Sequence, residues 1–243
     1  MKNNPPTRIE EVLKLNYKTE KEDIWLTSQD SLRKLIGISG IALPLLLLFV
    51  LWIDAGYTRP LFSISHYYFT RASGVFVIIV SLLAIFLLIY KGKEPVDFYL
   101  SSVAGLFALC VVIFPTDNIS DKCNDENFLY SLTILHESKF RPVFHYISAA
   151  IFLSCLAYMS LFLFTKSDKS PKLRGINKRR RNRIFRSCGV IMVLALMVIL
   201  ANPLRIISDD IFEKYHLMFW METIAVESFG IAWLVKAEII LKG

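Results

Sequence analysis

LIGISGIALPLLLLFVLWI, residues 35–53, is the first of several long stretches without a charged side chain. A helix of about 20 apolar residues crosses the roughly 30 Å hydrocarbon core of a bilayer at a rise of about 1.5 Å per residue. The four consecutive leucines at 45–48 do not show the alternation of a membrane β-strand. This stretch therefore predicts a membrane-spanning helix.

Five further apolar stretches of similar length follow, separated by short charged segments. Hydrophobic residues make up 54% of the chain and charged residues only 20%. A soluble domain of this size needs more polar residues to cover its surface. We therefore predict an all-α fold, a polytopic membrane helix bundle with about six transmembrane helices in residues 34–243. The spans are expected at Leu35–Ile53, Ala72–Tyr90, Phe98–Thr116, Pro142–Thr165, Ser187–Leu204 and Leu217–Val235.

Small residues cluster in two of these spans, at Gly37 and Gly40 and at Ser101, Ala104 and Gly105. In lipid, small residues let helix backbones approach closely, so both clusters predict tight helix contacts. The alternative is that small residues are simply common in membrane helices.

Basic residues gather on one side of the predicted topology. With six spans, the N-terminal segment 1–33, residues 91–97, residues 166–186 and the C-terminal end share one side, and these segments hold most of the basic residues beside the spans. Because cytoplasmic loops carry an excess of Lys and Arg, we predict a cell-membrane protein with both termini and the basic loop 166–186 in the cytoplasm. Segment 1–33 is either an amphipathic helix on the inner surface or a loosely ordered tail.

The net charge of +7 is concentrated in residues 166–186. In a soluble protein such an excess would suggest nucleic acid binding, but beside membrane helices it is typical of a topology signal, and we expect no nucleic acid partner. The lipid bilayer is the expected partner. A run of four cations either only sets the orientation or also binds anionic lipid; it comprises Lys178, Arg179, Arg180 and Arg181.

Ionisable residues also gather at the opposite, outward-facing side, where His66, Asp117, His145 and Glu222 are expected. Glu222 lies inside the last span, where an ionisable group is costly and faces the bundle or a water-filled cavity. His145 lies at a similar depth and is its expected partner if the two spans are neighbours. The four residues predict an outward-facing polar pocket that binds a lipid, an ion or a small ligand. The alternative is that they are interfacial side chains with ordinary hydrogen bonds.

Histidine and carboxylate side chains are also the usual ligands of zinc and similar metals, which makes His66, Asp117 and His145 metal candidates. With Glu222 as a general base toward a metal-bound water, the alternative function is a metal-assisted lipid-modifying hydrolase. The sequence contains no glycine-rich phosphate loop, GxSxG or HExxH motif. Whether the protein is an enzyme, and with which cofactor, therefore stays open.

Several short motifs stand near the ends of the spans: Ser63-Ile64-Ser65, Phe114-Pro115-Thr116, His145-Tyr146-Ile147-Ser148, Arg181-Asn182-Arg183 and Phe219-Trp220-Met221-Glu222. In this order they resemble a family of uncharacterised bacterial six-span integral membrane proteins, over nearly all of residues 60–240. A looser similarity is to membrane proteins of the Frag1/DRAM/Sfk1 type, which also place a Phe-Pro motif before a histidine-bearing span. Both resemblances imply the six-span architecture, and neither implies an activity.

Overall fold

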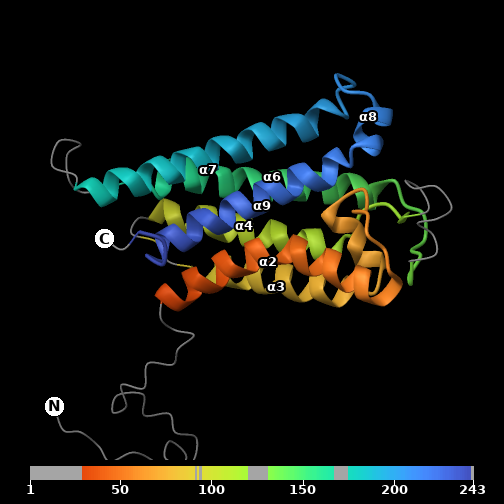
Figure 1. The fold of residues 1–243 in the computed structure, drawn as a ribbon, viewed down its shortest axis with the longest axis horizontal. Helices are drawn as coiled ribbons and strands as arrows, with labels where there is room; N and C mark the ends of the chain where they lie inside the picture. Colours follow the sequence, from red (N-terminus) through yellow and green to blue (C-terminus); the bar gives the residue numbers. More distant parts are fainter. Residues whose placement is uncertain (1–28, 91, 93–94, 120–130, 167–174, 242–243) are drawn as a thin grey trace, which may run out of the picture.

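A computed structural model describes residues 29–90, 92, 95–119, 131–166 and 175–241. These residues form long helices that run up and down one bundle (Figure 1), and they contain no strand, so the predicted all-α fold is confirmed. The elements are α2 (Gln29–Ala55), η2 (Ile64–Phe69), α3 (Ser73–Ile89), α4 (Pro95–Ile113), α6 (Phe140–Tyr158) with its π-helical continuation η4 (Met159–Leu163), α7 (Ile176–Ala201), α8 (Asp209–Lys214) and α9 (Leu217–Lys236).

The helices have the length and composition of membrane spans. Five in the described part of the chain, α2, α4, α6 with η4, α7 and α9, have 19–27 residues and are apolar enough to cross a bilayer. The apolar helix α3 has 17 residues, which is the lower limit for a crossing. Leu45, Phe49 and Ile53 of α2 are more than half exposed, as expected of side chains that face lipid. The chain is therefore a multi-pass membrane protein.

Close helix contacts depend on glycine. Helix α9 lies between α2 and α7, and α4 lies between α3 and α6. A Cβ atom on Gly230 of α9 would lie 2.7 Å from the carbonyl oxygen of Gly37 on α2, and a Cβ on Gly40 would lie 3.3 Å from Gly230 Cα. A Cβ on Gly105 of α4 would lie 2.6 Å from the carbonyl oxygen of Ala84 on α3. Both predicted small-residue contacts are confirmed, and they give the van der Waals packing that holds helices together in lipid.

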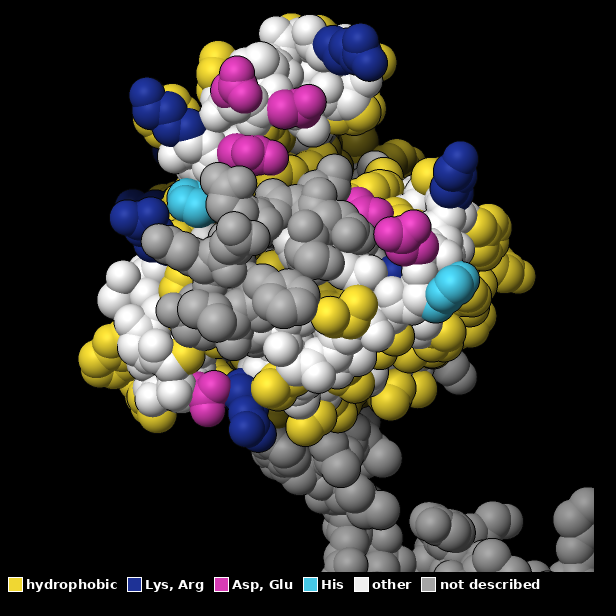
Figure 2. Space-filling model, turned by 90° about the vertical axis from the view of Figure 1, so that its right-hand side faces the viewer, with side chains coloured by type: hydrophobic (Ala, Val, Ile, Leu, Met, Phe, Trp, Pro, Cys, Tyr) yellow, Lys and Arg dark blue, Asp and Glu magenta, His cyan; other side chains and the backbone are white. Residues whose placement is uncertain are grey.

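The two ends of the bundle differ in chemistry. At the basic end, on the left in Figure 1, α2, α4 and α7 begin and α3, η4 and α9 end. At the other end, on the right, η2 and α8 meet the first turns of α3, α6 and α9. We call it the histidine end because it contains His66, His145 and His216. Figure 2 views the histidine end, with hydrophobic side chains on the flanks and acidic side chains gathered at the top over α8, which contains Asp209, Asp210 and Glu213.

The basic segment is helical from Ile176 onward, which corrects the prediction of a loop over residues 166–186. Helix α7 begins at Ile176, so the basic residues from Lys178 to Arg186 lie on its first turns. Lys and Arg have good helix propensity, and a span can extend past the hydrocarbon into the headgroup region. Residues 167–174, and residues 1–28 of the predicted N-terminal segment, lie outside the described residues. The predicted boundary at residue 33 falls within the first turns of α2.

Candidate functional site

His145 connects three elements at the histidine end. The side chain lies in the second turn of α6, and the residue is only 2% exposed. Its Nδ1 lies 2.8 Å from the carbonyl oxygen of Phe114, and its Nε2 lies 2.9 Å from Oγ of Ser65. Because a carbonyl oxygen can only accept, Nδ1 donates to Phe114, and in the neutral form of the ring Nε2 then accepts from the Ser65 hydroxyl. The ring thus joins α6 to η2 and to the residue that follows α4.

The start of η2 is fixed by three consecutive residues. Oγ of Ser63 lies 2.7 Å from Nδ1 of His66. The backbone N–H of Ile64 donates to Oε2 of Glu222 on α9 at 2.7 Å. Ser65 bonds to α6, as described above. The segment is therefore attached to two membrane helices through side chains that the sequence had singled out.

His145 and Glu222 do not form the direct contact that their depths suggested. Both ring nitrogens of His145 have partners within 2.9 Å, and neither partner is Glu222. The two side chains instead hold adjacent residues of the η2 segment, Ser65 and Ile64. This intervening segment is the reason why the expected pair is not made.

Asp117 belongs to a separate set of contacts at the same end. Its Oδ2 accepts a hydrogen bond of 2.8 Å from the Tyr146 hydroxyl, which in turn accepts one of 3.1 Å from Oγ1 of Thr116. Within the described ranges, no group of three or more His, Cys, Asp or Glu side chains is arranged to hold a metal ion. The structure therefore does not bring the metal candidates His66, Asp117 and His145 together as one group of ligands within the described residues.

A polar cavity of about 750 Å³ lies at the basic end, far along the bundle from the predicted pocket. It is bordered by the ends of α2, α4, α7 and α9 and by the residues after η4. Five basic and two acidic side chains line it, which gives a net charge of +3 when all are ionised. The basic residues are Arg33, Lys166, Lys178, Arg181 and Lys236, and the acidic residues are Asp97 and Glu238.

Aromatic rings form one wall of this basic cavity. The ring of Phe164 packs edge-to-face against Trp233 and Phe185, with centroid distances of 5.2 and 5.5 Å. Nζ of Lys236 lies 5.2 Å from the centroid of the Phe164 ring, within cation–π range. Nζ of Lys178 donates to the Phe164 carbonyl oxygen at 3.3 Å. The wall thus positions two ammonium groups beside the cavity.

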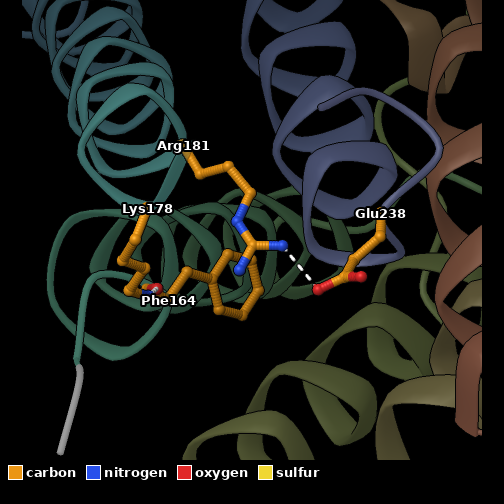
Figure 3. Close-up of polar contacts among 4 residues, drawn as sticks. All are labelled: Phe164, Lys178, Arg181 and Glu238. Atoms are coloured by element: carbon orange, nitrogen blue, oxygen red, sulfur yellow. Dashed lines mark hydrogen bonds and ion pairs between the residues drawn. The ribbon is translucent and has the colours of Figure 1, made fainter. Parts of the chain in front are cut away.

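Arg181 extends from α7 past Phe164 toward the end of α9 (Figure 3). Its Nη1 forms an ion pair of 2.5 Å with Oε1 of Glu238, and the two side chains are 17% and 54% exposed. Nε of Arg181 is buried and has no hydrogen-bond partner among the residues that the structure describes. Since a guanidinium presents its donors as a planar fork that matches carboxylate and phosphate, Arg181 and Arg33 are the lining residues best suited to bind an anion, and Arg181 already holds a carboxylate.

Another part of the lining is closely packed because residue 92 is glycine. A Cβ atom on Gly92 would overlap the side chain of Asp97, which is 9% exposed. Asp97 lies in the first turn of α4, where the helix dipole favours a carboxylate. Burial raises the pKa of the neighbouring Tyr90, an effect that the nearby Arg33 guanidinium opposes, so the phenol stays neutral. These residues leave the cations as the main charge of the cavity.

The run of cations Lys178–Arg181, for which the sequence left lipid binding open, divides between different surfaces. Lys178 and Arg181 line the basic cavity. Arg179 lies along an open groove on α7 together with Arg183 and Arg186. Arg180 is exposed and lines neither. The division follows from the helix, because consecutive residues point about 100° apart and cannot share one site.

Comparison with protein-family models, curated proteins and solved structures finds no match. The resemblance to uncharacterised six-span membrane proteins therefore stays a prediction.

Proposed function

We propose that this multi-pass membrane protein binds the phosphate-bearing headgroup of an anionic lipid in the basic cavity. The observation that carries the proposal is the lining: five cations converge on one cavity of about 750 Å³, and only two carboxylates oppose them. Gathering like charges at the edge of a low-dielectric bundle costs free energy, which a bound anion offsets. A phosphate group is the anion that a bilayer offers at this depth.

The position of the cavity supports a lipid as the source of the anion. Arg33, Arg181 and Lys236 lie near the ends of α2, α7 and α9, where we expect these helices to reach the level of the headgroups. Basic pockets between membrane helices on the cytoplasmic side are known sites for anionic headgroups. The excess of Lys and Arg at this end favours a cytoplasmic orientation of the cavity, with both termini on the same side.

The contacts of the histidine end favour a structural role over a ligand pocket. His145 and Glu222 are engaged with the η2 segment through hydrogen bonds of 2.9 and 2.7 Å. A metal-assisted hydrolase would need convergent metal ligands, and the described part of the chain offers no such group. We assign to this cluster the task of holding η2 against α6 and α9.

Native mass spectrometry of the detergent-purified full chain tests the proposal. We expect the wild type to retain an anionic phospholipid and Arg181→Gln to lose it, because the substitution removes the charge and keeps a polar side chain. Arg180→Gln is the matched control, since Arg180 is exposed on the same helix and outside the cavity. The unfolding temperature of each variant verifies that it is folded. Retention of zwitterionic lipid alone by the wild type, or equal loss of anionic lipid from both variants, would contradict the proposal.

A further inference from the structure

The ion pair between Arg181 and Glu238 points to the class of ligand, an inference that rests on the proposed function. We propose that the ligand of the basic cavity is a phosphomonoester, which takes the place of the Glu238 carboxylate on Arg181. A phosphomonoester carries about −1.5 to −2 charges at pH 7 and three terminal oxygens, whereas a phosphodiester carries one charge.

Glu238 has the properties of an occupant that a ligand can displace. Its side chain is 54% exposed, so water screens its ion pair, and exposed pairs contribute little to stability. Its backbone lies in the left-handed region, with a φ of 58°, which is unfavourable for a residue other than glycine. It follows the end of α9 and lies on a turn, so it can withdraw without moving a membrane span.

Arg181 is held more firmly than its partner and has capacity for a larger anion. Its side chain is 17% exposed, and it uses Nη1 for Glu238. Its buried Nε has no hydrogen-bond partner within the described ranges. A guanidinium binds two oxygens of one phosphate through parallel N–H donors. Because Nε–H faces a different edge of the guanidinium from Nη1, a phosphate in the position of the carboxylate would take its second hydrogen bond from the adjacent Nη2, a bond that Glu238 does not make.

Charge separates the two classes of phosphate ester. With Glu238 in place, five basic and two acidic side chains give the cavity a net charge of +3, and without it one carboxylate remains and the net charge is +4. A phosphodiester only replaces the charge that leaves. A phosphomonoester adds close to one further negative charge, which the Lys178 and Lys236 ammonium groups beside Phe164 favour.

Isothermal titration of the full chain in detergent with two short-chain lipids tests the inference. Dihexanoyl phosphatidic acid is the phosphomonoester, and dihexanoyl phosphatidylglycerol is the phosphodiester. At pH 7.5 we expect phosphatidic acid to bind about tenfold more tightly. This preference should shrink as the pH falls through about 6, where the monoester takes up its second proton.

Variants test the exchange with Glu238. Glu238→Gln should bind phosphatidic acid about two- to fivefold more tightly than the wild type, as expected from loss of a competing exposed ion pair. Glu213→Gln, an exposed acidic residue at the histidine end, is the matched control and should not change the affinity. Glu238→Gly, which suits the left-handed backbone, should bind as Glu238→Gln does and be at least as stable as the wild type.

The outcomes separate the inference from the proposed function. Equal affinity for the two lipids at pH 7.5, or weaker binding of phosphatidic acid by Glu238→Gln, overturns the phosphomonoester inference, while the anion site stands if Arg181→Gln weakens both lipids. If neither lipid binds, the proposed function itself is contradicted. Titration with glycerol 3-phosphate shows whether the phosphomonoester belongs to a lipid or to a water-soluble ligand. If it binds as tightly as phosphatidic acid, the ligand is a water-soluble phosphomonoester; if it binds more weakly, the ligand is a lipid.

Discussion

A methyl group added to Gly230 should force α9 away from α2. The Cβ of an alanine at this position would lie 2.7 Å from the carbonyl oxygen of Gly37 and 2.8 Å from Cγ1 of Ile41. The oxygen belongs to the backbone of α2, so the overlap can be relieved only by moving one helix relative to the other. Overpacking of this kind costs about 1–3 kcal/mol.

Gly74→Ala is the matched control for Gly230→Ala. At residue 74, in the first turn of α3, an added methyl group meets nothing within 4 Å. Both substitutions replace glycine with a better helix former, so the difference between their unfolding free energies isolates the steric cost. Reversible unfolding in one detergent should place Gly230→Ala about 1–3 kcal/mol below Gly74→Ala. Gly40→Ala, whose nearest contacts are at 3.3 Å, should fall between them.

A Gly230→Ala protein as stable as Gly74→Ala would refute this reasoning. It would mean that the backbones of α2 and α9 do not approach closely enough to exclude a methyl group. The contact between these helices also brings Arg33 and Lys236 to the same cavity, so the geometry of the proposed site would then be in error.

Three further predictions concern the histidine end and the orientation. Ser65→Ala removes the partner of Nε2 on buried His145 and should lower the unfolding free energy by about 1–3 kcal/mol; an unchanged value would contradict the network. Glu222→Leu, which removes the acceptor of an η2 backbone N–H, should destabilise more than Glu222→Gln, which keeps an acceptor oxygen. In intact cells, with all native cysteines replaced, an impermeant maleimide should label Glu213→Cys and spare Arg180→Cys; the reverse pattern would show the opposite orientation.

The membrane helices were predictable because lipid imposes a strong constraint on sequence. A backbone in hydrocarbon must satisfy its own hydrogen bonds, so each span appears as a long helical run of apolar residues. The predicted span Ala72–Tyr90 contains α3, Ser73–Ile89, almost residue for residue. The basic segment was less predictable, because good helix propensity alone does not distinguish a continued helix from a loop, and no apolar pattern marks the start of α7 at Ile176.

The sequence predicted which polar residues lie at the histidine end, but not which of them bond to one another. Pro115 stops α4 shortly after Ile113, which explains why the carbonyl of Phe114 is available to His145. The short segment η2 has no periodic apolar pattern of its own. Its position between His145 and Glu222 therefore could not be inferred from the sequence.

The basic cavity could not be predicted because its lining is assembled from distant segments. Arg33 and Lys236 each stand beside a span, where a single cation is typical of an orientation signal. Only the packing of α2 and α7 on α9 brings these charges together. Glu238 follows the last span in a left-handed conformation that no propensity predicts for glutamate.

Photo-crosslinking of a phosphatidic acid analogue tests most directly the central claim that the basic cavity holds an anionic headgroup. With the reactive group placed beside the phosphate, we expect cross-links in the peptides that contain Lys178, Arg181 or Lys236, the residues that border the cavity. An excess of unlabelled phosphatidic acid should abolish them. Cross-links confined to the histidine end, or cross-links that the competitor does not reduce, would contradict the claim.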